Sequence, residues 1–150
     1  MTQVSEPIAN QTSEVLPARV VEQLIFLASA KSRQIDKVGG LAGPAIDLND
    51  VAEDFENFTD AIWMSVEAGY ISLETQRELK SLSRMLEDMS GPDNARLWLV
   101  SGLNAPEWDE VRRKAREILR SDDILDFISN PPKSAGSLID AIRGDLPSFE

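Results

Sequence analysis

The feature of this sequence that most restricts its fold is the spacing of its apolar residues, which recur three and four positions apart along most of the chain. Such spacing places them on one side of an α-helix, because about 3.6 residues complete one turn. No segment shows a convincing alternation of apolar and polar residues, the period typical of a half-buried strand. The sequence therefore predicts an all-α fold, a compact bundle of five to seven helices.

Residues that start and stop helices set the expected limits of these segments. Only Gly69–Ile71 separates the second helix from the third, which predicts an antiparallel helix hairpin. The Val20–Val21 pair also favours a strand, so a short strand at the start of the first segment is the alternative. Residues 1–15 lack the periodicity and predict a flexible N-terminal tail before a single domain, 16–150. The predicted helices cover about 17–38, 49–68, 72–89, 94–103, 106–119, 122–128 and a short last piece around 138–142.

The composition excludes several kinds of chemistry. The chain of 150 residues contains neither Cys nor His, so it lacks disulfides, thiolate ligands and the commonest general base. We therefore predict a protein that is not an enzyme and that carries no cofactor. Its net charge of −11 disfavours nucleic acid and anionic membranes and favours basic protein partners. No apolar run approaches the roughly 20 residues of a membrane span, and we expect a cytoplasmic protein.

The most acidic stretch, IDLNDVAEDFENFTDAIW at residues 46–63, contains no Lys or Arg. A calcium-binding loop starting at Asp47 would need an oxygen ligand, a Gly and a Glu at its fifth, sixth and twelfth positions. Those positions hold Val51, Ala52 and Phe58, so we predict no metal site. Carboxylates along one helix also diverge into water, whereas a catalytic pair must converge in a cleft.

A helical projection of this stretch separates an apolar side from an acidic side. Val51, Phe55 and Ile62 fall together on the side expected to face the core. Acidic residues beside an exposed aromatic ring suit the Lys and Arg side chains of a partner, through ion pairs and cation–π contacts. The alternative is that another helix of the domain covers Trp63. We predict a partner-binding site here and call it the acidic surface; it consists of Asp50, Glu53, Glu56, Asp60, Trp63 and Glu67.

The segment 106–119 carries charges of both signs. Asp109 with Arg113, and Glu110 with Lys114, stand four residues apart in the order that stabilises a helix. We therefore expect a solvated, self-neutralised face. Trp108 in this segment and Trp98 before it lie in apolar patterns and are predicted to belong to the core.

A set of mostly apolar positions between Gly69 and Leu119 forms a recognisable pattern: Gly69-Tyr70-Ile71, Leu82, Leu86, Met89-Ser90-Gly91, Leu97-Trp98, Leu103, Glu107-Trp108, Val111-Arg112, Ala115 and Leu119. This pattern resembles one in small acidic bacterial proteins, some of which are similar to immunity proteins encoded beside toxins. The resemblance implies a stoichiometric inhibitor that binds a cognate toxin and blocks its active site or substrate surface. The alternative is a helical regulatory or adaptor module without catalytic activity, and a carboxylate-based enzyme comes third.

Overall fold

The structure is a computed structural model that describes residues 12–41 and 43–146. Within them every regular element is a helix and no strand occurs, which confirms the predicted all-α fold. The same ranges also contain three short 3₁₀ helices: η2 (Pro92–Trp98), η3 (Val100–Asn104) and η4 (Lys133–Ala135). The α-helices are α1 (Leu16–Ala28), α2 (Lys31–Val38), α3 (Leu48–Ala61), α4 (Trp63–Glu67), α5 (Leu73–Asp88), α6 (Pro106–Leu119), α7 (Asp122–Ser129) and α8 (Gly136–Arg143).

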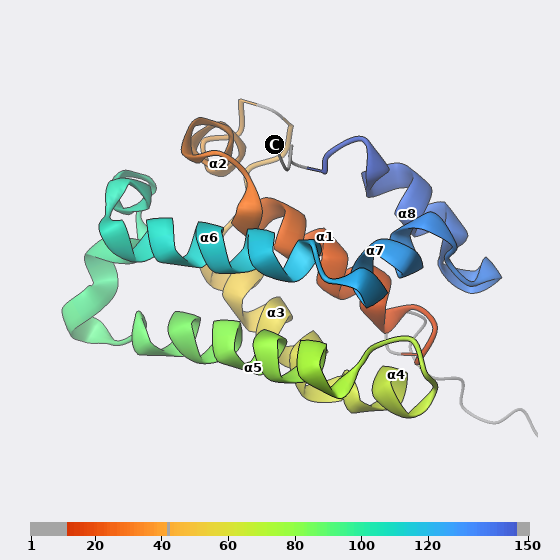
Figure 1. Cartoon of the computed structure of the whole chain (residues 1–150). Coiled ribbons are helices and arrows are strands. Elements are labelled where there is room, and N and C mark those ends of the chain that lie inside the picture. The colour runs from red at the N-terminus through yellow and green to blue at the C-terminus, as the bar shows by residue number, and fades with distance from the viewer. Residues whose placement is uncertain (1–11, 42, 147–150) are drawn as a thin grey trace, which may run out of the picture.

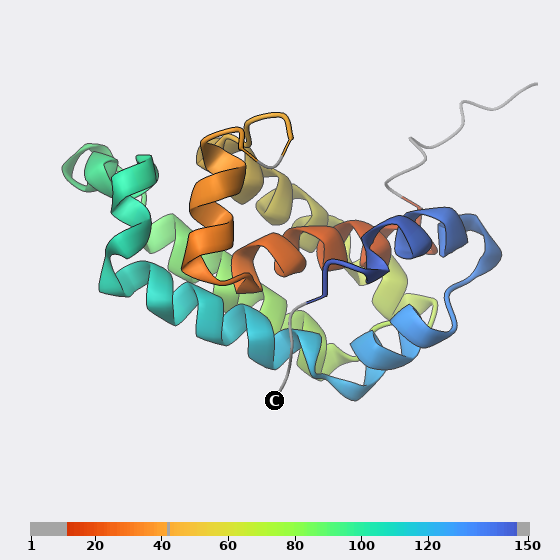
Figure 2. The same cartoon turned by 90° about the horizontal axis from the view of Figure 1, so that it is seen from above.

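The described residues thus contain eight α-helices, more than predicted, because two expected helices are each interrupted. The first breaks at Ser29, whose extended backbone (ψ 154°) separates α1 from α2, and the second breaks at a tight turn around Ile62. The alternative of a strand at Val20–Val21 is wrong, since both residues lie inside α1. In Figure 2, α2 leaves the end of α1 at a steep angle.

The predicted helix at 94–103 is instead the pair of 3₁₀ helices η2 and η3, with an extended residue, Leu99, between them. Gly102 explains how closely the two pieces approach. A Cβ atom at this position would lie 2.3 Å from the backbone oxygen of Arg96. Only glycine fits there, so Gly102 fixes the packing of the two 3₁₀ helices against each other.

The four longest helices contact one another in a closed ring: α1 with α3, α3 with α5, α5 with α6, and α6 with α1 (Figure 1). α1 also contacts α7 and α8, and ten of its 13 residues are buried. A helix that is apolar on nearly all sides belongs inside a domain. The core therefore forms around α1, and α3 covers one side of it.

The predicted antiparallel hairpin is confirmed. The chain passes from α4 through Gly69, whose positive φ of 89° favours glycine, and returns as α5 (Figure 1). The Ser72 hydroxyl caps α5 by accepting a hydrogen bond from the backbone N–H of Thr75 at 3.1 Å. The Asp123 carboxylate accepts from the backbone N–H of Ser72 at 2.8 Å and ties α7 to this corner.

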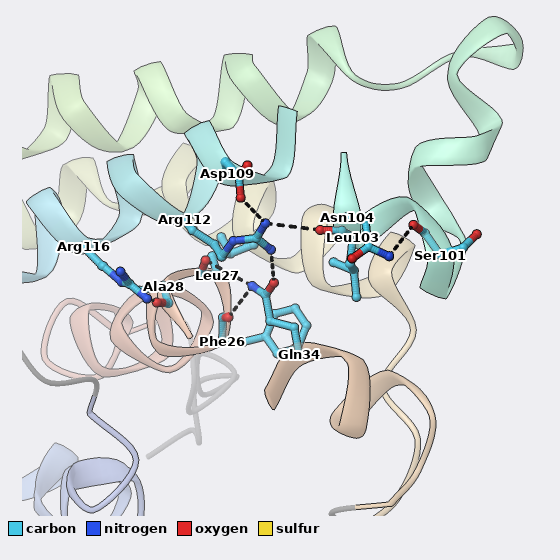
Figure 3. Close-up of polar contacts among 10 residues, drawn as sticks. All are labelled: Phe26, Leu27, Ala28, Gln34, Ser101, Leu103, Asn104, Asp109, Arg112 and Arg116. Carbon is cyan, nitrogen blue, oxygen red and sulfur yellow. Dashed lines mark hydrogen bonds and ion pairs between the residues drawn. The ribbon is translucent and has the colours of Figure 1, made fainter. Parts of the chain in front are cut away.

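A buried polar network fixes the junction between α1 and α2 against α6 (Figure 3). Gln34 on α2 donates to the backbone oxygen of Phe26 at 2.9 Å, and Arg116 on α6 donates to that of Ala28 at 2.8 Å. These donors bond carbonyls of the last turn of α1, where the regular helical hydrogen bonds end. Arg112, only 6% exposed, donates to Gln34 at 2.6 Å and to the backbone oxygen of Leu103 at 3.2 Å.

The indole rings of the two core tryptophans differ in burial. Trp108 is 1% exposed and donates through Nε1 to the backbone oxygen of Leu97 at 2.7 Å, which confirms its predicted place in the core. Trp98 is partly buried and packs edge-to-face on Trp108, with ring centroids 5.3 Å apart.

Of the expected tail, residues 1–15, the first 11 residues lie outside the described ranges. The part that is described is packed on the domain. Val15 is buried, and the backbone oxygen of Ser13 accepts a hydrogen bond from the Ser65 hydroxyl at 2.8 Å. The packed chain therefore includes residues before Leu16, the expected start of the domain.

Candidate functional site

α3 presents its two sides as the sequence predicts. Val51 and Phe55 are buried against the core, as is Ile62 at the junction with α4. Asp47 caps the first turn by accepting a hydrogen bond from the backbone N–H of Asn49 at 2.8 Å. The carboxylate residues of the acidic surface are all exposed: Asp50, Glu53, Glu56, Asp60 and Glu67.

Trp63 is 51% exposed, so the alternative that another helix covers it is wrong. Its neighbour Met64 instead packs partly against the core. The turn at Ile62 explains the difference. A single helical projection does not hold across it, because Trp63 begins a separate helix, α4.

The structure divides the acidic surface rather than gathering it in one concave site. Glu53 and Glu56 line a hollow of about 220 Å³ between α3 and α5, together with Glu87 and Trp98. Glu56 and Asp60 line a second hollow, of about 250 Å³.

The second hollow contains cations that the sequence of α3 does not reveal. Lys80 and Arg84 of α5 line it with Glu56 and Asp60. No ion pair joins these groups among the described residues. This end of the acidic surface is nevertheless less negative than the sequence of α3 alone indicates.

Asp50 lies on the other flank of α3. It lines a groove of about 490 Å³ that is bounded by α1, the connection between α2 and α3, the first turns of α3 and the end of α8. Asp47 and Asp54 line the same groove. The opposite flanks of α3 therefore contribute to different depressions of the surface.

Ion pairs in the described structure favour α6 and leave α3 unpaired. Arg113 bonds to Glu110 and, at 3.1 Å, to Glu117. None of the carboxylates of α3 takes part in an ion pair within the described ranges.

The partners predicted for the α6 charges are wrong. Arg112 turns inward and bonds Asp109 at 2.6 Å, while Lys114 bonds Glu78 on α5. Because α6 packs against both α1 and α5, Lys114 bonds a carboxylate of α5 in place of its expected partner Glu110, and Arg112 takes Asp109, the expected partner of Arg113. The hydrogen bond from Arg112 holds the pKa of the Asp109 carboxyl below its ordinary value.

Within residues 12–41 and 43–146, no group of three or more acidic side chains is arranged to hold a metal ion. No helix in the same ranges has the length and apolar character needed to cross a membrane. A scan against protein-family models and searches of curated proteins and of solved structures found no match to this chain.

Proposed function

We propose that this protein binds a basic protein partner through the carboxylates of α3, and that the partner is a bacterial toxin which it inhibits as an immunity protein in the cytoplasm. The resemblance of residues 69–119 to such proteins supports the toxin as partner. A net charge of −11 supports a basic one, since opposite charges steer two proteins together.

The observation that carries the proposal is the unpaired charge of α3. Five carboxylates stand on this helix, all exposed and all without an ion pair in the described part of the chain. On α6, by contrast, Arg113 and Lys114 pair with carboxylates. A folded domain gains nothing from a row of like charges at helical spacing, whereas a surface that meets cations does.

Trp63 adds a contact of a different kind. A half-exposed indole ring on α4, the helix that also carries the exposed Glu67, supplies apolar area and a π face to an approaching Lys or Arg. Tryptophan is also one of the residues enriched among the energetically dominant contacts of interfaces. Inhibition then follows from coverage of the toxin surface and requires no chemical step.

The test uses the basic protein encoded beside this chain, co-expressed and purified with it. We expect a one-to-one complex whose association rate falls steeply as the salt concentration rises. The triple variant Glu53→Gln/Glu56→Gln/Asp60→Asn should associate about tenfold more slowly at low salt.

The matched control removes the same number of charges from other exposed positions, by Glu74→Gln/Asp93→Asn/Asp126→Asn. It should change the rate by less than about threefold. If the two triple variants slow association equally, net charge alone is responsible and the α3 surface is not the binding site. A complex that forms without loss of the partner's activity would favour the adaptor function over inhibition.

A further inference from the structure

The groove beside Asp50, called here the α1/α3 groove, differs in kind from the outer acidic surface because its floor is apolar. Ile25 and Phe26 of α1, Val51 of α3 and Ile142 of α8 line its roughly 490 Å³. Each of these four keeps between 4% and 9% of its surface exposed. The floor is thus part of the core that remains open to the outside.

The rim of the groove is acidic. Asp50 and Asp54 line it and have no ion pair in the described structure. Asp145 also lines it, although its carboxylate forms an ion pair with the Arg33 guanidinium at 2.8 Å. Lys37 is the one cation among the described residues of the lining. An apolar floor under a negative rim is complementary to an apolar group that is flanked by positive charges.

We infer that the α1/α3 groove docks a short basic segment of a protein partner, with an aliphatic or aromatic side chain on the floor and Lys or Arg side chains against Asp50 and Asp54. The inference rests on the proposed function in that both require a basic partner. It assigns the anchoring contact to a flank of α3 that does not include Glu53, Glu56 or Asp60.

Other occupants fit the groove less well. An anion would be repelled by the rim, and a bare metal ion would gain nothing from the apolar floor. The volume is within the range of pockets that enclose a small molecule or a few side chains. An apolar side chain that leaves water for this floor supplies affinity, and the flanking cations supply orientation.

A phage-displayed library of random 12-residue peptides, selected on the immobilised full chain at low salt, tests the inference without knowledge of the natural partner. The enriched peptides should carry net positive charge and at least one large apolar residue between basic ones. Synthetic copies should bind with an affinity that falls as salt rises. Absence of enrichment, or enrichment of neutral or acidic peptides, would overturn the inference.

Three variants locate the binding. Ala45→Trp places a large ring in the groove from an exposed position of the lining, and should weaken the peptides at least about tenfold. Asp50→Asn/Asp54→Asn should weaken them by a similar factor. Lys37→Met should instead raise the affinity of the peptides several-fold, because it removes the cation that competes with them for the acidic rim.

The matched control Glu74→Gln/Asp126→Asn removes two exposed charges outside the groove and should leave peptide binding within about twofold of the parent. Thermal unfolding verifies that each variant is folded. If Ala45→Trp unfolds the chain, the opposite effects of the Asp50/Asp54 and Lys37 variants still decide the question.

The same variants separate this inference from the proposed function. A natural partner that is weakened by the Glu53/Glu56/Asp60 variant but not by Ala45→Trp would leave the proposed function standing and remove the groove from it. If peptides bind the groove but no basic partner is inhibited, the groove inference stands and the proposed inhibition is wrong.

Discussion

α3 and α6 are both 14 residues long and both pack against α5 and α1, yet they carry charge in opposite ways. α6 holds four acidic and four basic residues, and several of them pair with one another or with α5. α3 holds five acidic residues and no basic one.

The difference shows which charges serve the fold. On α6, Arg112 reaches the interior and joins α2 to the end of η3 through its bonds to Gln34 and the Leu103 backbone. On α3, the inner side consists of uncharged residues such as Val51, Phe55 and Thr59, and the charges remain outside. The fold therefore depends on part of the α6 charge and on none of the α3 charge, which leaves α3 free for a partner.

The largest expected effect on stability comes from removing Arg112, the buried cation of α6. Arg112→Ala leaves the buried Gln34 side-chain oxygen and the Leu103 carbonyl without their donor, and should lower the free energy of unfolding by about 2–4 kcal/mol. The control Arg113→Ala removes a cation from the exposed pairs with Glu110 and Glu117, and should lower the free energy of unfolding far less, because solvent screens exposed ion pairs. Urea unfolding measures both; equal effects would show that the buried network has no special role.

Removing pairs of carboxylates should have a smaller effect on stability, and the effect should be opposite in sign on α6 and α3. Glu110→Gln/Glu117→Gln removes the partners of Arg113 and should lower stability by about 0.5 kcal/mol at low salt. Glu53→Gln/Glu56→Gln removes two like charges three residues apart and should raise stability by about 0.3 kcal/mol. Urea unfolding at low and high salt measures both pairs. A loss of stability in the α3 variant would mean that its carboxylates have partners within the fold.

The smallest effect concerns pH. The bond from Arg112 lowers the pKa of Asp109 in the folded chain from its ordinary 3.8, so the carboxylate contributes stability that is fully present above that value. The contribution is lost as the pH falls through the lowered, folded pKa. Asp109→Asn should therefore destabilise the protein slightly at pH 7 and progressively less in acid below about pH 4. Urea unfolding across this range tests it; an unchanged difference would contradict the assignment.

Most of the helical segments, the hairpin at Gly69 and the core position of Trp108 could be predicted because the signals for them are local. Apolar spacing and glycine positions act within a few residues of the elements they define. The break at Ser29 could not be predicted in this way. It depends on hydrogen bonds that Gln34 and Arg116, on other helices, donate to carbonyls at the end of α1.

The candidate site could be predicted only in part, for the same reason. The exposure of the α3 carboxylates follows from their projection on one helix. Their separation into different hollows depends on how α3 meets α5, which brings Lys80 and Arg84 beside Asp60, and on where α8 ends. The α1/α3 groove joins Asp50 to Asp145, residues from distant parts of the chain that no local pattern connects.

The network around Gln34 has a consequence for the thermodynamics of binding at the groove. Gln34 anchors α2 to α1 and α6, and the backbone N–H of Ile46 donates to the Lys37 carbonyl at 3.0 Å, which fixes the connection that forms one wall. The two ends of this connection, at Lys37 and Ile46, are therefore held together before a partner arrives. Ordering a mobile side chain on binding costs about 0.5–1.5 kcal/mol, and a preformed wall avoids much of that entropy loss. Differences in affinity among groove variants should then lie mainly in the lifetime of the complex.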